Sequence, residues 1–196
     1  DREYNIEQIG VAVLILAVDT TTRAGSLALV RGDTVIREHR GDPARTHAER
    51  LPVDLMHLCD AAGVEIREVD LYAVAAGPGS FTGLRIGLAA VQRFAMAWSR
   101  HVVPVSTLEA LAITAPPDAS RVVVWMDAQR GQVFAQVFDV DPPQSGTAGP
   151  LAPASSVPPT EALREHHSLL ESAFFVGDGA SKYRETIAAA LGRTTR

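Results

Sequence analysis

The fold of this 196-residue chain is decided at residues 77–87, by the segment Gly77-Pro78-Gly79-Ser80-Phe81-Thr82-Gly83-Leu84-Arg85-Ile86-Gly87. A short apolar run, residues 71–76, precedes it and predicts a buried strand. After the turn, apolar side chains share one helical stripe, which contains Leu84, Leu88, Val91, Ala95 and Trp98. A buried strand, a glycine-rich turn and a one-sided helix in this order predict an α/β protein in which helices cover a sheet.

The glycine-rich turn allows two interpretations. Glycines permit positive φ angles and close backbone approach, and free N–H groups at a helix start can hold an anion such as phosphate. The segment lacks the Gly-Lys-Ser/Thr of a Walker A loop, and its third glycine comes one residue too late for the Rossmann fingerprint. Gly77, Gly79 and Ser80 are therefore candidates to face a nucleotide. A tight strand-to-helix turn without a ligand is the equally weighted alternative.

Small residues recur along one face of the predicted helix, at Gly79, Gly83, Gly87 and Ala90. A glycine inside a helix costs roughly 1 kcal/mol relative to alanine, so this spacing indicates close packing of another helix. The neighbour is either the helix predicted over residues 51–62 or a helix of another chain, and the spacing does not distinguish them. In the second case the face is a dimerisation surface.

Three strand-like runs lie before this region. Residues 13–18 are apolar, and residues 26–30 and 34–39 follow across turn-forming segments. An antiparallel meander is the economical interpretation. Together with the runs at 71–76 and 102–105, it predicts a mixed sheet.

A further helix is predicted over residues 51–62, where apolar side chains recur on one face and Gly63 is placed to end the helix. Pro52 is expected in its first turn, because the missing N–H costs little there. Residues 46–50 are then a lead-in or a kinked extra turn.

The second half of the chain repeats this pattern weakly. Residues 121–126 predict a strand that ends at Asp127, and residues 132–138 alternate like its hairpin partner. Asp19 and Asp127 then occupy equivalent positions, which indicates a duplicated lobe.

Residues 141–191 are predicted to form a loop, a strand and a helix. Residues 141–159 are rich in Pro, Ala, Gly and Ser and predict a connection rather than a packed element. Residues 173–176 predict a strand and residues 181–191 a helix.

We therefore expect two lobes. The first covers residues 11–105, and the second, smaller lobe covers residues 106–196. Residues 1–10 have no clear periodicity and are interpreted as an extension or a remnant of another sequence.

Two aspartates at predicted strand ends are candidates for chemistry. Asp19 is followed by Thr20, Thr21 and Thr22, and a carboxylate there can orient a metal-bound nucleotide or a water. An aspartate that caps its own turn is the commoner case. Asp127 allows the same two interpretations, and both stay open. Asp19, Thr20 and Asp127 join the glycine turn as candidate nucleotide-facing residues.

Composition limits the class of protein. Hydrophobic residues make up 46% of the chain and charged residues 21%, as in soluble globular domains. The net charge of −5 offers no general basic field, so a nucleic-acid substrate would be held mainly by another protein. The single cysteine, Cys59, excludes an intramolecular disulfide and agrees with a reducing compartment, so we expect a cytoplasmic protein. The apolar run at residues 11–18 is too short to span a bilayer, and no membrane association is expected.

Catalytic signatures are missing from the sequence. The six histidines form no H-x-x-x-H or H-E-x-x-H pair, so we expect no helical metal site. Ser80 lacks the G-x-S-x-G context of a nucleophile elbow. Cys59 lies on the apolar face of a predicted helix and is interpreted as a core residue. We expect neither a catalytic residue nor a metal ligand.

Several segments together resemble the TsaB family, formerly called YeaZ, over roughly residues 14–138. They are Ile15-Leu16-Ala17-Val18-Asp19-Thr20, Ser26-Leu27-Ala28-Leu29, His47 with Leu51-Pro52, residues 77–87, Val105-Ser106-Thr107-Leu108-Glu109-Ala110-Leu111 and Asp127-Ala128-Gln129-Arg130-Gly131-Gln132-Val133. The resemblance implies an actin-like, sugar-kinase-like (ASKHA, ribonuclease H-like) fold of two lobes with mixed sheets flanked by helices. Family members continue beyond the point where Arg196 ends this chain, so the second lobe is expected to be incomplete.

The resemblance also implies a role. TsaB proteins themselves look like degenerate relatives of TsaD. TsaD is the subunit that transfers a threonylcarbamoyl group to adenosine 37 of tRNAs that read codons beginning with A. TsaD relatives bind metal through a paired-histidine helix, which this chain lacks, so the resemblance implies a non-catalytic partner subunit of TsaD. It further implies that TsaE joins the pair, that the chain self-associates as a homodimer, and that tRNA is contacted only indirectly.

In the family, helices of the first lobe make the dimer contact. Carried over to this sequence, the expected interface consists of Leu51, Leu55, Leu58, Gly79, Phe81, Thr82, Gly83, Leu84, Ile86, Gly87 and Ala90. No cofactor is expected to be tightly bound, and binding of ATP or ADP with Mg at the complex interface is left open. The alternative function is an actin-fold ATP-dependent phosphotransferase or ATPase, based on Asp19, Asp127 and the glycine turn. A peptidase is the least favoured, because no nucleophile and base can be paired from these motifs.

Overall fold

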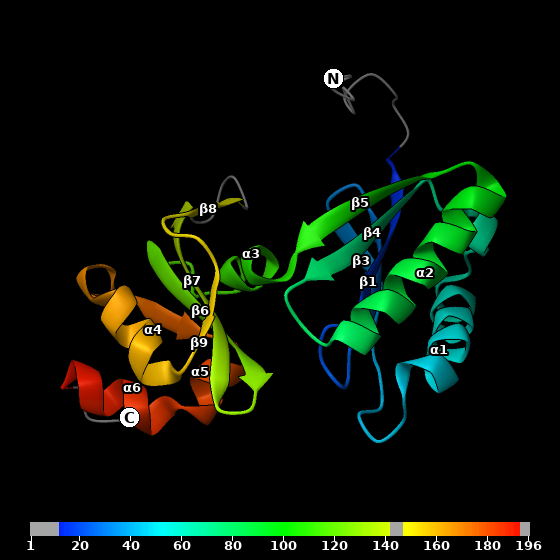
Figure 1. Ribbon diagram of the computed structural model, residues 1–196. Helices are drawn as coiled ribbons and strands as arrows, with labels where there is room; N and C mark the ends of the chain where they lie inside the picture. The colour runs from blue at the N-terminus through cyan, green and yellow to red at the C-terminus, as the bar shows by residue number, and fades with distance from the viewer. Residues whose placement is uncertain (1–11, 142–146, 193–196) are drawn as a thin grey trace. The chain divides into compact units, whose positions relative to one another are not determined.

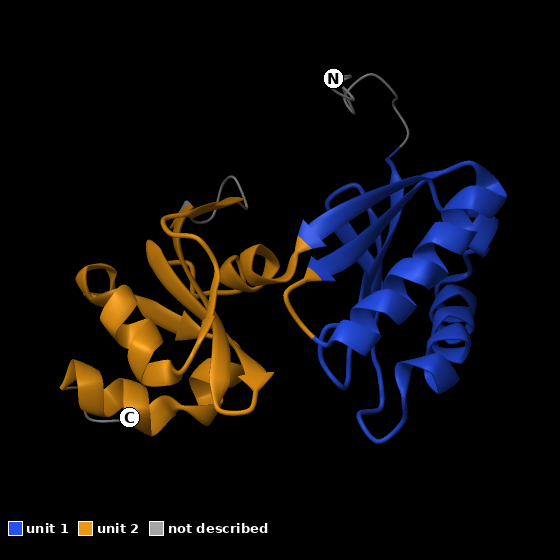
Figure 2. Ribbon diagram, in the orientation of Figure 1, with its two compact units in different colours: residues 1–76, 80–105 blue, residues 77–79, 106–196 orange. Residues whose placement is uncertain are grey.

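The structure, a computed structural model, describes residues 12–141 and 147–192. The chain divides into two compact units. Unit 1 contains the residues up to Ala76 together with Ser80–Val105, and unit 2 contains Gly77–Gly79 together with the residues from Ser106 onward (Figure 2).

Unit 1 is built on a five-stranded sheet in the order β3-β2-β1-β4-β5. The strands are β1 (Leu14–Asp19), β2 (Ser26–Arg31), β3 (Thr34–Arg40), β4 (Leu71–Gly77) and β5 (His101–Ser106). The central strand β1 is antiparallel to β2 and parallel to β4, and β3 is antiparallel to β2. The predicted meander and mixed sheet are confirmed.

Two helices cover one face of this sheet side by side, α1 (His47–Ala62) and α2 (Phe81–Trp98) (Figure 1). Alternate β1 residues Leu14, Leu16 and Val18 are buried beneath them and form one core with the apolar stripes of the helices. This alternation follows from the two-residue period of a strand, which sends successive side chains to opposite faces.

α1 begins at His47, so residues 47–50 form the extra helical turn that was one of the two alternatives for residues 46–50. Thr46 is its N-cap in a capping box, in which Glu49 N donates to Thr46 Oγ1 over 3.4 Å and the Glu49 carboxylate accepts from Thr46 N over 2.9 Å. The hydrogen bonds from Thr46 lower the pKa of Glu49. Pro52 consequently lies inside the helix, and its expected place in the first turn is wrong. The capping box fixes the start because it satisfies N–H groups that a helix end otherwise leaves unpaired.

Unit 2 contains a second five-stranded sheet in the order β10-β6-β7-β8, with β9 also paired to β7. The strands are β6 (Arg121–Gln129), β7 (Gln132–Asp141), β8 (Thr147–Pro150), β9 (Ser155–Val157) and β10 (Phe174–Val176). β6 is antiparallel to β7 and parallel to β10, so it has the same kinds of neighbour as β1. The loop predicted over residues 141–159 is wrong in part, because β8 and β9 pair with the edge of β7. An unpaired strand edge offers backbone donors and acceptors that even a short Pro-rich segment can use.

Helices cover both faces of β6. Val123 and Trp125 pack toward α4 (Pro159–Glu165), α5 (Asp178–Lys182) and α6 (Arg184–Leu191), and Val122 and Val124 pack toward α3 (Thr107–Ala112). Burial on both faces explains the continuous apolar run of this strand. Two short 3-10 helices complete the fold, Ile66–Glu68 and His167–Leu169.

The helix predicted over residues 181–191 is divided in the structure. α5 ends at Lys182 and α6 begins at Arg184, with Tyr183 between them. In the part of the chain that the structure describes, no helix has the length and apolarity needed to cross a membrane.

Candidate functional site

The loop of residues 20–25, between β1 and β2, is where most of the predicted site residues of unit 1 meet. Asp19 precedes it, and its Oδ1 accepts hydrogen bonds from Thr21 N over 2.8 Å and from Thr21 Oγ1 over 2.6 Å. The Asp19 carboxylate therefore caps its own turn, which is the commoner of the two predicted roles. Asp19 also lines a cavity of about 570 Å³ together with Ser26, Glu38 and Arg40.

The glycines of α2 receive this loop. Gly83 and Gly87 are buried, and a Cβ on Gly83 would overlap the Thr20 carbonyl oxygen while one on Gly87 would overlap Thr20 Oγ1. The closest neighbour of both glycines is Thr20 in a loop of the same unit rather than the closely packed helix that was predicted, although the His47 ring of α1 also lies 3.3 Å from the position of a Cβ on Gly83. Thr20, predicted to face a nucleotide, is buried beneath α2.

The start of α2 is capped by the chain itself. Ser80 Oγ accepts a hydrogen bond from Gly83 N over 3.2 Å, and Ser80 N donates to the Thr21 carbonyl over 2.8 Å. Gly77 ends β4 with φ of 109°, and Gly79 lies in the turn that follows. One of the N–H groups expected to hold an anion is thus satisfied by Ser80.

A buried arginine of α1, which the sequence analysis missed, holds the same loop. Arg50 is 2% exposed, and its Nη1 donates to Asp54 Oδ2 over 2.6 Å. Its Nη2 donates to the carbonyl of Ala24 and, over 2.9 Å, to His47 Nδ1. A guanidinium has no acceptor, so His47 accepts at Nδ1 and donates from Nε2 to the Thr22 carbonyl, 2.8 Å away. Arg50 and His47 together tie the loop to α1.

The signal for Arg50 is present in the sequence. Arg50 and Asp54 are four residues apart, a spacing that lets their side chains form an ion pair on one side of the helix, next to the stripe of Leu51, Leu55 and Leu58. Gly41 provides the space for this side chain, because a Cβ there would overlap the guanidinium.

The predicted interface residues of α1 are core residues. Leu51, Leu55 and Leu58 are buried in unit 1, so the expectation that they contact another chain is corrected. These leucines lie on the side of α1 that faces the sheet, and an amphipathic helix packs its apolar side against the core of its own domain.

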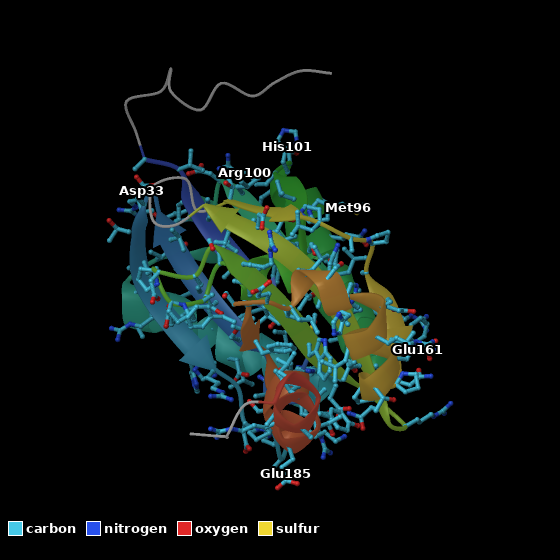
Figure 3. All side chains as sticks on the ribbon, turned by 90° about the vertical axis from the view of Figure 1, so that its left-hand side faces the viewer. Asp33, Met96, Arg100, His101, Glu161 and Glu185 are labelled. Carbon is cyan, nitrogen blue, oxygen red and sulfur yellow. The ribbon has the colours of Figure 1, made fainter. Side chains whose placement is uncertain are left out.

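The exposed sides of α1 and α2 still carry large apolar side chains. We call this surface the outer helical face, and it contains Val53, Met56, Phe81, Leu88 and Met96. Phe81 is 73% exposed, Met56 65% and Met96 82%. Figure 3 labels Met96 near the end of α2 that leads through Arg100 to His101, the first residue of β5. Of the predicted α2 interface residues, Phe81 and Thr82 are exposed, whereas Leu84, Ile86 and Ala90 are half-buried.

The strand-end aspartate of unit 2 is also engaged within the chain. Asp127 Oδ2 accepts a hydrogen bond from Lys182 Nζ over 2.8 Å, and Oδ1 accepts one from Gln129 N over 3.1 Å. The bond to Asp127 raises the pKa of Lys182. Lys182, which the sequence analysis missed, is the single lysine among 18 basic residues. Within residues 12–141 and 147–192, no three His, Cys, Asp or Glu side chains form a group that could hold a metal ion.

The chain is similar to known proteins along most of its length. The sequence model of TsaD, described as tRNA N6-adenosine threonylcarbamoyltransferase, matches residues 41–195. A Bacillus subtilis protein named tRNA threonylcarbamoyladenosine biosynthesis protein TsaB is 30% identical over 181 residues, which are 91% of this chain and 76% of the relative. The protein of the same name from Escherichia coli is 35% identical over 129 residues, 65% of this chain and 55% of the relative. The solved structure titled YeaZ from Pseudomonas aeruginosa has a TM-score of 0.72 at 30% identity and covers 94% of this chain and 81% of that chain.

The chain is an actin-like, ASKHA-type α/β protein, because each unit has a mixed sheet flanked by helices and the sequence matches TsaD. The predicted fold class is therefore confirmed. The chain spans about half of the length of the Escherichia coli relative. It belongs to the TsaB family, also called YeaZ.

Proposed function

We propose that this chain is a non-catalytic partner subunit of TsaD, required for threonylcarbamoyl transfer to adenosine 37 of tRNAs that read codons beginning with A. The names of its relatives place them in the biosynthesis of threonylcarbamoyladenosine in tRNA. The observation that carries a partner role for this chain is the outer helical face, with exposed Met56, Phe81, Leu88 and Met96 on two adjacent helices. Clustered exposed apolar side chains of this kind mark protein contact surfaces.

The site geometry supports a binding role over catalysis. Asp19 and Asp127, the two carboxylates predicted for chemistry, accept hydrogen bonds from Thr21 and Lys182 of the same chain. The alternative of a phosphotransferase or ATPase needs at least one of them to be available to a metal-bound nucleotide. No observation favours that alternative.

The finer assignments extend this proposal. TsaE joins the pair with TsaD, and the outer helical face also supports weaker self-association. The acidic chain contacts tRNA only through its partner, because a net charge of −5 gives little attraction for phosphates. Any Mg-bound ATP or ADP binds in the assembled complex and is not held tightly by the isolated chain, which calorimetry with Mg-ATP tests directly.

Two leucines of matched exposure provide the test of the partner role. Leu88 on α2 is 41% exposed and Leu151 in unit 2 is 40% exposed. We expect Leu88→Glu to weaken binding to TsaD of the same organism by about tenfold or more, because a charge replaces an apolar contact at the centre of the interface. Leu151→Glu should bind like the unaltered chain.

The readouts are the dissociation constant for TsaD and the threonylcarbamoyladenosine content of tRNA in cells, measured by mass spectrometry of nucleosides. Loss of both in Leu88→Glu but not in Leu151→Glu supports the proposal. Full pairing and full modification in Leu88→Glu would show that this face is not the contact. An unaltered chain that fails to bind TsaD would overturn the partner role itself.

A further inference from the structure

The sulfur atoms of the chain fall into two classes by exposure. The chain has one cysteine, Cys59, and three methionines, Met56, Met96 and Met126. Cys59 and Met126 are buried in the cores of unit 1 and unit 2. Met56 on α1 is 65% exposed and Met96 on α2 is 82% exposed. Methionine is usually a buried residue that fills gaps in apolar cores, so two thioethers this open to solvent are unusual.

The cysteine does not compete with these methionines for an oxidant. A thiol is ordinarily the sulfur group that reacts first with a peroxide, because its thiolate is a strong nucleophile. Burial raises the pKa of the Cys59 thiol, and the charge of the neighbouring Asp60 raises it further. The thiol is therefore both enclosed and protonated, and cysteines in this state are inert. An oxidant in solution reaches the thioethers of Met56 and Met96 first.

Both exposed methionines lie toward the same end of the outer helical face. α1 and α2 run side by side in the same direction (Figure 1), and they are level where the His47 ring lies 3.3 Å from the Cβ position of Gly83. Met56 follows His47 by nine residues and Met96 follows Gly83 by thirteen. At a rise of about 1.5 Å per residue, these are distances of about 14 Å and 20 Å along the two helices. A change at both sulfur atoms therefore alters one region of the surface.

The sulfur of Met96 is accessible without any opening of the fold. Met96 lines a cavity of about 460 Å³ at the end of α2, together with Gln92, Arg100 and Val102. Gln92 and Arg100 carry N–H donors. A sulfoxide oxygen formed at Met96 thus has hydrogen-bond donors beside it in the same cavity.

Oxidation by a peroxide converts a thioether in a single balanced step. The sulfur lone pair attacks one oxygen of hydrogen peroxide, the S–O bond forms as the O–O bond breaks, and the other oxygen leaves as water. The sulfur loses two electrons, which the peroxide gains. The product, methionine sulfoxide, is polar and disrupts apolar contact surfaces. Methionine sulfoxide reductases reverse the step, with electrons from a dithiol that becomes a disulfide.

We propose that Met56 and Met96 are sites of reversible oxidation by peroxides, and that their sulfoxides weaken the binding of the chain to its partner. The second half of this inference rests on the proposed function, because it takes the outer helical face as the contact with TsaD. A partner that covers this face also shields both sulfur atoms. The free chain is therefore the form that is oxidised, and oxidation keeps it from assembling until a reductase restores the thioethers.

Peptide mapping by mass spectrometry tests the assignment of the sites. The full chain is treated with hydrogen peroxide under native conditions, and sulfoxide formation is followed at each methionine. Met56 and Met96 should react at least about tenfold faster than Met126, because a buried thioether is reached only when the fold opens. In urea the three methionines should react at similar rates, which shows that the fold causes the difference. Equal rates in the folded chain, or faster oxidation of Cys59, would overturn the assignment.

The effect on partner binding is measured with chain that has been oxidised and then freed of peroxide, so that TsaD itself never meets the oxidant. We expect the dissociation constant for TsaD of the same organism to rise about tenfold once both methionines are sulfoxides, because apolar contacts in an interface are lost. Treatment with methionine sulfoxide reductase and dithiothreitol should restore the original value. Circular dichroism melting confirms that the oxidised chain is folded.

Two leucine variants identify the side chains that are responsible. Leucine is close to methionine in volume and is apolar, but it has no sulfur to oxidise. In the chain that carries Met56→Leu and Met96→Leu, peroxide treatment should no longer change binding. In Met126→Leu, which keeps both exposed methionines, treatment should weaken binding as it does in the unaltered chain. Each protein is compared with its own untreated form, so that any effect of the substitution itself on binding cancels.

Two results would overturn the regulatory half of the inference. If both methionines are sulfoxides and binding to TsaD is unchanged, while Leu88→Glu still weakens it, the proposed function stands and the regulation is wrong. If the double leucine variant still loses binding on treatment, another group is responsible. Failure of the untreated chain to bind TsaD removes the proposed function and the regulation together, whereas the peptide mapping decides the modification sites by itself.

Discussion

Arg50 connects more parts of unit 1 than any other side chain described above. It joins α1 to the 20–25 loop through the Ala24 carbonyl, and it is bonded to Asp54 and His47 on its own helix. The loop in turn fills the space above Gly83 and Gly87 of α2. A single buried charge therefore helps to set how α1, α2 and the β1–β2 turn fit together.

Replacing Arg50 with methionine should strongly destabilise unit 1. The change removes the guanidinium from the buried Asp54 carboxylate and leaves it only the His39 ring, whose Nε2 lies 3.2 Å from Asp54 Oδ1. Breaking a buried pair in this way costs about 3 to 5 kcal/mol of unfolding free energy. Urea unfolding checks this, with Arg164→Met as the control because that side chain is 79% exposed and should change stability by no more than about 0.5 kcal/mol. A loss below about 1 kcal/mol for Arg50→Met would mean that water takes over the role of the guanidinium.

At the scale of single elements, one side of α2 is buried in unit 1 and the other is exposed. The side with Gly83 and Gly87 closes on the 20–25 loop, and the side with Phe81 and Leu88 is exposed. Substitutions of the glycines therefore test the packing of the unit, whereas substitutions on the exposed side test binding. An interface test that replaces either glycine with a large residue would confuse the two.

The two glycines should differ in their tolerance of alanine. In Gly83→Ala the new methyl group meets the backbone carbonyl of Thr20, and in Gly87→Ala it meets the Thr20 side chain, which can rotate. Overpacking typically costs about 1 to 3 kcal/mol, and we expect Gly83→Ala at the upper end and Gly87→Ala at the lower end. Thermal unfolding measures the difference, with exposed Thr82→Ala as the control. Equal and negligible effects at both glycines would indicate that the loop moves away freely.

At the scale of the whole molecule, both units repeat one arrangement. The strands β1 and β6 each pair with an antiparallel neighbour and a parallel one, and each carries an aspartate near its carboxyl end. In unit 1 that aspartate caps a turn, and in unit 2 it holds Lys182. The repeat was recognisable in the sequence, but the two uses of the aspartate were not.

The chain should lose stability in alkali. Burial raises the pKa of the Cys59 thiol above its ordinary value of 9.0 and that of the Tyr72 phenol above 10.0, so the unfolded chain ionises first as the pH rises. Lys182 acts in the same direction. The stabilisation from its bond to Asp127 is fully present below pH 10.5, the ordinary pKa of a lysine, and is lost as the pH rises through the raised pKa of Lys182.

We therefore expect the unfolding midpoint to fall steadily above about pH 9 in thermal melts. Cys59→Ala should remove the earliest part of the decrease, and Lys182→Met the latest. A midpoint that stays constant up to about pH 11 would contradict this expectation.

The sequence by itself determined the strands and helices of unit 1, the turn at residues 77–87, the fold class and the family. These depend on periodicity and turn residues, which are local properties of the chain. Only the tertiary structure decided that Gly83 and Gly87 accept Thr20, that Leu51 and Leu58 are core residues, and that Lys182 neutralises Asp127. Each of these joins residues far apart in sequence or distinguishes the buried side of a helix from the exposed one. Spacing specifies that a helix has an apolar or small-residue side, but the path of the rest of the chain determines what covers it.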